Sequence, residues 1–161
     1  MSIKAGDHIP SASVKHMTND GIEDVGTDQL FAGKKVVLFA LPGAFTPTCS
    51  AKHLPGFIQQ AGALKAKGVD TIACLSVNDA FVMKAWGDDQ GAGDTVMMLA
   101  DGNAEFTKAV GLELDASGYG MGTRSQRYAM VVDDGVVKSL HVEEAAGGLD
   151  VSSAENVLAS L

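Results

Sequence analysis

Three short apolar runs, each followed by a helical pattern, constrain the fold of this chain more than any other feature of its sequence. The runs span residues 36–41, 72–77 and 95–100. Each is too short for a core helix and is largely apolar on both faces, which is typical of strands that are covered on both sides. Strands that alternate with helices in this way pair in parallel. We therefore expect parallel central strands with helices packed on the sheet.

Two turn signals add hairpins near the ends of the chain. Asn19-Asp20-Gly21 and Asp133-Asp134-Gly135 each separate two runs with strand character, over residues 14–17 and 22–25 and over residues 128–132 and 136–142. Such residues readily adopt the backbone conformations of tight turns. No repeat, linker or low-complexity tract divides the sequence. The expected fold class is α/β, a mixed sheet flanked by helices, in one domain over residues 1–161.

The longest helix is expected to begin at Thr46 and Pro47. Threonine is a favoured N-cap, and proline suits the first helical position because its missing N–H would be unbonded there anyway. The helix should run to about residue 67, with a kink near its middle where Pro55 removes one backbone hydrogen bond. The expected caps of three shorter helices are Thr27, Asn78 and Ser152, the last forming a capping box with Glu155.

Charge and composition exclude several classes of function. Twelve Lys and Arg against 20 Asp and Glu give a formal charge of −8 and a pI near 4.8, so the basic field that nucleic acid or anionic membrane requires is lacking. No apolar run approaches the roughly 18 residues of a membrane helix, and Asp7 and His8 interrupt any secretory segment. Two cysteines cannot build a four-thiolate zinc site or a disulfide framework. We expect a cytoplasmic protein with free thiols.

Cys49 is placed where a buried strand would pass through a tight loop into the long helix. As the third helical residue, its sulfur would lie near unpaired backbone N–H groups and the positive end of the helix dipole, and both favour a thiolate over a thiol. A helix end stabilises a nearby negative charge by at most about 2 kcal/mol, which is less than the free energy needed to keep a thiol largely ionised at neutral pH. A reactive Cys49 therefore needs a second cation or further donors.

Four residues could supply that charge. Lys52 and His53 follow Cys49 in the same helix, whereas Arg124 and Arg127 precede the strand expected at residue 128. Arginine suits a partly dry site because it stays charged and offers a fork of donors. Alternation along an extended strand sends side chains three residues apart to opposite faces. Only one arginine should then reach the sulfur, and the spacing leaves open which one.

Other features favour ordinary structural roles. Cys74 lies in a strand that is apolar on both faces, and we expect a buried small hydrophobe there rather than a resolving thiol. Cys49 and His53 have the spacing of a metal pair, but His8, His16 and His141 add no ligand cluster, so neither a metal nor a cofactor is expected. The glycine-rich run over residues 118–122 matches no phosphate cradle, and we expect a flexible connection.

The sequence resembles the type II peroxiredoxins, the peroxiredoxin 5 group of thiol peroxidases. The resemblance covers nearly the whole chain and rests on residues 42–50 (PGAFTPTCS), 52–57 (KHLPGF), 76–82 (SVNDAFV) with Trp86, 99–101 (LAD) and 127–132 (RYAMVV). It implies a thioredoxin-like fold with an N-terminal hairpin extension. It also implies that Cys49 is the peroxidatic cysteine, shielded by Pro42, that Thr46 hydrogen-bonds to the peroxide, and that Arg127 is the catalytic arginine.

The resemblance further implies reduction of hydrogen peroxide and alkyl hydroperoxides through a sulfenic acid on Cys49, in redox homeostasis and defence against oxidative stress. Animal members use a C-terminal cysteine to resolve this intermediate, whereas residue 151 here is valine. The chain is closer to members with cysteines at the places of Cys49 and Cys74, which are often recycled by glutathione and glutaredoxin or by thioredoxin. A homodimer packed near the active-site loops is implied as well.

Two other functions remain open from the residues alone. A thiol–disulfide oxidoreductase on the same fold usually carries Cys-x-x-Cys, whereas Ser50, Ala51 and Lys52 follow Cys49 here. A redox sensor or chaperone-like binder would react with peroxide once and stop. An insulin-reduction assay separates the oxidoreductase from a peroxidase, and turnover of peroxide with a thiol donor separates the sensor or binder from one.

Overall fold

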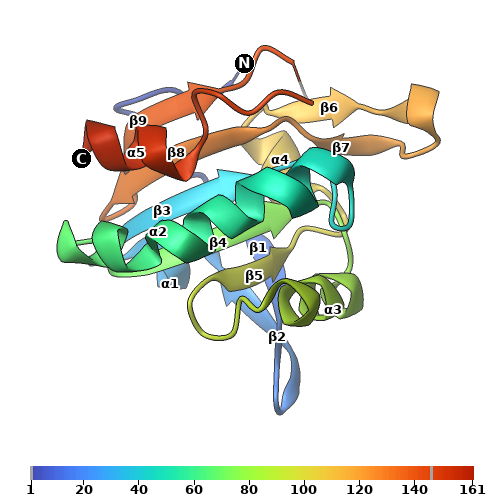
Figure 1. The fold of residues 1–161 in the computed structure, drawn as a ribbon, viewed down its shortest axis with the longest axis horizontal. Helices are drawn as coiled ribbons and strands as arrows, with labels where there is room; N and C mark the ends of the chain where they lie inside the picture. The colour runs from blue at the N-terminus through green and yellow to red at the C-terminus, as the bar shows by residue number, and fades with distance from the viewer. Residues whose placement is uncertain (1, 146) are drawn as a thin grey trace.

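The structure, a computed structural model that describes residues 2–145 and 147–161, is an α/β fold around a seven-stranded mixed sheet (Figure 1). The strand order is β2-β1-β5-β4-β3-β8-β9. These strands are β1 (Ser13–Thr18), β2 (Gly21–Gly26), β3 (Lys35–Ala40), β4 (Thr71–Ser76), β5 (Met97–Ala100), β8 (Tyr128–Asp133) and β9 (Val136–Val142). β3, β4 and β5 pair in parallel and the other neighbours are antiparallel. The expected mixed sheet, with its N-terminal hairpin, is confirmed.

Helices cover both faces of the sheet. They are α1 (Thr27–Phe31), α2 (Leu54–Ala66), α3 (Ala80–Gln90), α4 (Glu105–Ala109) and α5 (Ala154–Ser160). Side chains alternate along β3, so that Val37 and Phe39 pack in one apolar cluster with residues of α2, α3 and α5, while Val36 and Leu38 pack in another with residues of α1 and α4. Figure 1 shows α2 lying across the front of the sheet. No helix in the described ranges has the length and apolar character to span a bilayer.

The expected caps of α1, α3 and α5 are each wrong by one residue. The N-caps are Gly26, Asp79 and Ser153. Each expected cap instead makes a hydrogen bond to a distant part of the chain: Thr27 Oγ1 donates to Pro10 O (2.9 Å), Asn78 Oδ1 accepts from Ala44 N (3.0 Å) and Ser152 Oγ donates to Glu143 Oε2 (2.6 Å). Tertiary contacts therefore take these polar side chains away from the helix ends.

The glycine-rich run, for which the sequence predicts a flexible connection, forms the turn of a hairpin. It joins β6 (Glu113–Asp115) to β7 (Thr123–Ser125) in a second, two-stranded sheet, and it contains a 3₁₀ turn, η2 (Ser117–Tyr119). Gly120 and Gly122 have φ of 71° and 65°, which glycine adopts without strain. A hydrogen bond from Ala116 N to Gly122 O (2.7 Å) closes the turn. Figure 1 shows the hairpin reaching past the sheet on the side where α2 begins.

Candidate active site

Cys49 lies at the start of the long helix, after the loop that leaves β3. Helical backbone begins at Pro47, and Ser50 N bonds to Thr46 O (2.9 Å), so Cys49 is the third helical residue as predicted. The helix then widens into a π-helical turn, η1 (Cys49–His53), in which Leu54 N bonds to Cys49 O. This turn ends just before Pro55, which cannot donate a backbone hydrogen bond. The interruption expected near the helix middle is therefore at its start.

The Cys49 sulfur accepts a hydrogen bond from the Arg127 guanidinium. Arg127 Nη2 is 3.0 Å from Cys49 Sγ, and the two residues are 2% and 0% exposed. The antiparallel pairing of β3 with β8, in which Ala40 faces Tyr128, brings the residue before β8 to the loop that carries Cys49. A guanidinium stays charged and only donates, so it stabilises a thiolate more than a neutral thiol. Arg127 thus supplies the cation that the helix end requires.

The other candidate cations lie elsewhere. The Lys52 side chain is exposed on the outer face of η1. Arg124, in β7, donates from Nη1 to Pro42 O (3.2 Å) and from Nε to Met121 O (3.1 Å). Of the two arginines, Arg127 is the one bonded to the sulfur, which confirms that only one of them reaches it.

His53 contacts Arg127 rather than the sulfur. Its Nδ1 is 2.8 Å from Arg127 Nη1, and its Nε2 is 3.0 Å from Ser152 O. Because a guanidinium only donates and a carbonyl only accepts, Nδ1 is the acceptor and Nε2 carries the proton. Burial, followed by the charge of Arg127, lowers the pKa of His53 from 6.5 to about 3. His53 is therefore a neutral acceptor that orients Arg127.

Glu143 fixes the segment that presents the Ser152 carbonyl to His53. Its Oε2 accepts hydrogen bonds from Asp150 N (2.8 Å), Ser152 N (2.7 Å) and Ser152 Oγ (2.6 Å). Burial alone would raise the pKa of Glu143, but these hydrogen bonds outweigh it and the pKa lies below its ordinary value. The backbone adds a bond from Glu143 N to Arg127 O (2.9 Å). No sequence pattern distinguishes Glu143 from its neighbour Glu144, because its partners are set by the path of the chain.

The loop before Cys49 is held by bonds to its own backbone and to the segment that follows β4. Thr46 Oγ1 donates to Gly43 O (2.6 Å), so the hydroxyl bonds back into the loop instead of capping the helix. Ala44 N donates to Asn78 Oδ1 (3.0 Å). Phe45 has φ of 62°, a left-handed conformation that costs a non-glycine residue on the order of 1 kcal/mol. Pro42 is half-buried at the other end of the loop.

Cys74 behaves as a packed thiol. It is fully buried in β4, within the same apolar cluster as Cys49, and both cysteines are free. Burial, followed by the proximity of Cys49, raises the pKa of Cys74 well above its ordinary value. A thiol that stays protonated is a poor nucleophile, so Cys74 fits the expected role of a small hydrophobe.

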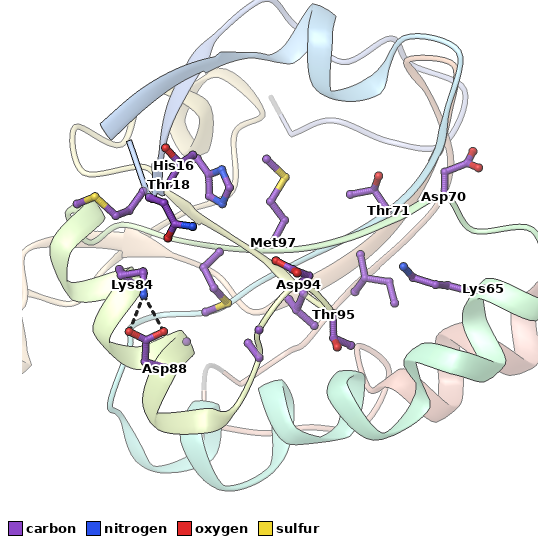
Figure 2. Close-up of a pocket in the computed structure, with 18 residues that line it drawn as sticks. His16, Thr18, Lys65, Asp70, Thr71, Lys84, Asp88, Asp94, Thr95 and Met97 are labelled. Atoms are coloured by element: carbon purple, nitrogen blue, oxygen red, sulfur yellow. Dashed lines mark hydrogen bonds and ion pairs between the residues drawn. The ribbon is translucent and has the colours of Figure 1, made fainter. Parts of the chain in front are cut away.

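A cavity of about 540 Å³ lies where β4 and β5 begin. This is the end of the sheet opposite to the one that carries Cys49. Figure 2 shows Thr71 and Met97 among the residues that line the cavity, with the ion pair of Lys84 and Asp88 across the view from Thr71. No cysteine and no predicted site residue lines it. Within residues 2–145 and 147–161, no group of three or more His, Cys, Asp or Glu side chains is arranged to hold a metal ion.

We expect the stability of the protein to fall on acidification because His53 is held neutral. Its pKa is about 3 in the folded chain and near 6.5 when unfolded, so between these values only the unfolded state binds the proton. The free energy of unfolding should decrease by up to about 1.4 kcal/mol per pH unit as the pH falls through this window. Urea unfolding of wild type and His53→Gln between pH 7.5 and 5 measures this slope.

The comparison stays above pH 5 so that it reports on His53 and not on Glu143. The pKa of Glu143 is lowered in the folded chain, so protonation of Glu143 also reduces the free energy of unfolding, but only below about pH 4.5. His8→Gln is the matched control, because His8 is exposed and its backbone forms a bridge to Val136. The His8→Gln protein should keep the wild-type slope. An unchanged slope in His53→Gln would contradict the neutral, buried state of His53.

Comparisons with known proteins agree with this geometry. The family model described as Redoxin matches residues 4–158. Peroxiredoxin-2E-2, chloroplastic, of Oryza sativa subsp. japonica is 55% identical over 165 residues, which cover 99% of this chain and 73% of the relative. The crystal structure of reduced Prx3 in complex with H₂O₂ from Vibrio vulnificus is 58% identical with a TM-score of 0.94 and covers 98% of both chains.

A third similar structure is that of peroxiredoxin 5 from Alvinella pompejana, which is 37% identical with a TM-score of 0.86 and covers 98% of this chain and 97% of that one. The matches extend over the sheet, the helices and the Cys49 region together. This chain therefore belongs to the redoxin family as a type II peroxiredoxin, a thiol-dependent peroxidase of redox defence with a thioredoxin-like fold.

Proposed function

We propose that Cys49 is the peroxidatic residue and that it reduces hydrogen peroxide and alkyl hydroperoxides. The observation that carries this assignment is the 3.0 Å hydrogen bond from Arg127 Nη2 to Cys49 Sγ at a buried helix start. The thiolate attacks one peroxide oxygen, an S–O bond forms and the O–O bond breaks. Sulfur is oxidised to a sulfenic acid, and the other oxygen leaves as hydroxide or alkoxide, which takes a proton from solvent to give water or an alcohol.

Stabilisation of the departing oxygen determines the rate of this step. A more stable thiolate is also a weaker nucleophile, so ionisation alone does not make a fast peroxidase. Negative charge grows on the leaving oxygen, where Arg127 and the Cys49 N–H act as fixed donors. Thr46 takes the opposite role: its proton is donated to Gly43 O, so its oxygen accepts from the peroxide O–H. Pro42 shields the sulfur from water at the loop end.

An external thiol completes the cycle in this proposal. Cys74 is buried with a raised pKa, and residue 151 is valine, so neither position favours an internal disulfide. Glutathione with glutaredoxin, or thioredoxin, would then reduce the sulfenic acid through a mixed disulfide. Because Cys49 has no exposed surface, the η1 turn or the preceding loop must open for this reductant.

A homodimer and a cytoplasmic location complete the proposal. Phe45 and Phe81 are 54% and 67% exposed, and the Phe45 ring packs against Trp86 with centroids 6.5 Å apart. Large exposed aromatic side chains beside the Cys49 loop are typical of a subunit contact. Two free cysteines suit a reducing compartment.

Mass spectrometry after one equivalent of hydrogen peroxide tests the oxidation step. The reduced protein should gain one oxygen on Cys49, and added glutathione should convert it to the mixed disulfide. A bridge between Cys49 and Cys74 in the monomer would contradict the external route. Steady-state peroxide consumption with glutathione and glutaredoxin, and separately with thioredoxin, identifies the reductant, and absence of turnover with both would favour a sensor over an enzyme.

A further inference from the structure

Arg124 joins two loops that are far apart in the sequence. Arg124 and Arg127 are the only arginines of the chain. One guanidinium binds the active-site loop at Pro42 O (3.2 Å) and the turn of the β6–β7 hairpin at Met121 O (3.1 Å). A planar fork of donors can bridge two carbonyls in this way. A lysine ammonium is a compact charge on a flexible stem, so it would fix the two carbonyls less firmly.

Gly43 is the residue over which this guanidinium lies. A Cβ at position 43 would lie 2.8 Å from Arg124 Nη1, 3.1 Å from Thr46 Cγ2 and 3.3 Å from Met121 Cε. The first contact is closer than side-chain atoms approach, so a residue other than glycine would displace the guanidinium. Glycine permits the close approach, but it also leaves the backbone free to rotate on either side of it.

Bonds on both sides of Gly43 remove that freedom. The peptide after Gly43 is held by Asn78, which accepts from Ala44 N, and by Thr46, which donates to Gly43 O. The peptide before Gly43 is held by Arg124 through Pro42 O. The direction of the Gly43 carbonyl, and with it the rotamer of the Thr46 hydroxyl, depends on both anchors.

We propose that Arg124 is a positioning residue for peroxide reduction, acting through Gly43 on Thr46. It holds the Pro42–Gly43 peptide so that Gly43 O takes the Thr46 proton and the Thr46 oxygen stays directed at the peroxide O–H. Arg124 does not touch the sulfur, so the reactivity of the Cys49 thiolate itself is independent of it. This inference rests on the role of Thr46 in the proposed function.

The first test compares two reactions of Cys49. Arg124→Met should lower the second-order rate with hydrogen peroxide about tenfold, the effect of one lost hydrogen bond on a reacting geometry. Alkylation by iodoacetamide, which does not use Thr46, should change less than twofold. Lys52→Met removes the same charge from an exposed position near Cys49 and should leave both rates unchanged.

A double-mutant cycle with Thr46→Val identifies the route of the effect. If Arg124 acts through Thr46, Arg124→Met should cost nothing further in the Thr46→Val background. Multiplicative losses, or a wild-type peroxide rate in Arg124→Met, would overturn the inference. A wild-type rate in Thr46→Val alone would instead overturn the role of Thr46 in the proposed function.

Arg124→Lys keeps the test decisive if Arg124→Met does not fold. It preserves the charge but offers one compact donor to two carbonyls. We expect its peroxide rate to fall at least threefold with an unchanged alkylation rate, and circular dichroism with thermal unfolding verifies its fold. A wild-type peroxide rate in this variant would show that charge alone suffices and would contradict the positioning role.

Discussion

Replacing Cys49 with serine is expected to abolish peroxide reduction while leaving the fold intact. The reaction needs an atom that is anionic near neutral pH and that can be oxidised to a stable two-electron product, and a serine hydroxyl provides neither. The two side chains have nearly the same shape, so the buried site at the start of η1 is preserved. Stopped-flow mixing with hydrogen peroxide should show no fast phase in Cys49→Ser.

Cys74→Ala is the matched control for this variant. Cys74 is equally buried in the same apolar cluster, but its pKa is raised and no step of the proposed reaction uses it. Its oxidation rate should stay within about twofold of wild type, with a modest loss of stability from the smaller side chain. Peroxide turnover that survives in Cys49→Ser but is lost in Cys74→Ala would reverse the assignment of the two thiols.

Replacing Arg127 with methionine is expected to slow peroxide reduction at least a hundredfold. Arg127 donates to Cys49 Sγ and to His53 Nδ1, so the variant removes the cation beside the thiolate and the donor nearest the leaving oxygen. Removal of one preorganised donor in a dry site costs about 3 kcal/mol of transition-state stabilisation. The second-order rate constant from stopped-flow kinetics measures the loss.

Arg127→Lys separates charge from geometry. Lysine keeps the positive charge, but its single ammonium cannot reproduce the two bonds that the guanidinium makes to Sγ and Nδ1. We expect a rate between those of wild type and Arg127→Met. Thermal unfolding of both variants monitors the fold, because Arg127 is 2% exposed and its loss leaves buried acceptors unpaired. A folded Arg127→Met protein with the wild-type rate would remove Arg127 from the mechanism.

The arrangement behind Arg127 explains why one guanidinium can serve a buried sulfur. A buried charged group is stable only where its own donors and acceptors have hydrogen-bonding partners. His53, held neutral in a single tautomer by Arg127 and Ser152, accepts one bond without adding a second positive charge. Glu143 fixes Ser152 by accepting hydrogen bonds from its backbone N–H and its hydroxyl. The site is therefore a continuous network that runs from the start of η1 to the segment before α5.

Local patterns in the sequence predicted the elements that depend on local physics. Apolar runs of strand length predicted β3, β4 and β5 and their parallel pairing, and the turn residues predicted both hairpins. Cys49 at the third position of a helix followed from Thr46-Pro47. Each of these features depends on backbone preferences and burial within a few residues, and for that reason short patterns carry the information.

These local patterns did not predict which polar side chains bond to distant segments instead of to a nearby helix end. Three side chains have the chemistry of helix caps: Thr27, Asn78 and Ser152. Each of them bonds instead to another segment that the fold brings near. The neighbouring residue, before Thr27 and after Asn78 and Ser152, forms the cap. The same reason applies to the β6–β7 hairpin, whose turn is closed by backbone bonds that glycine content alone does not reveal.

The amino-acid sequence by itself determined the order of strands and helices in the seven-stranded sheet, the place of Cys49 at a helix start and the need for a cation beside it. The tertiary structure decided which cation that is: the pairing of β3 with β8 places Arg127 at the sulfur and Arg124 on the loop before it. It also decided the protonation of His53 and the part taken by Glu143. Hydrogen bonds and charge interactions depend on distance in space, and only the folded chain sets the distances between residues far apart in the sequence.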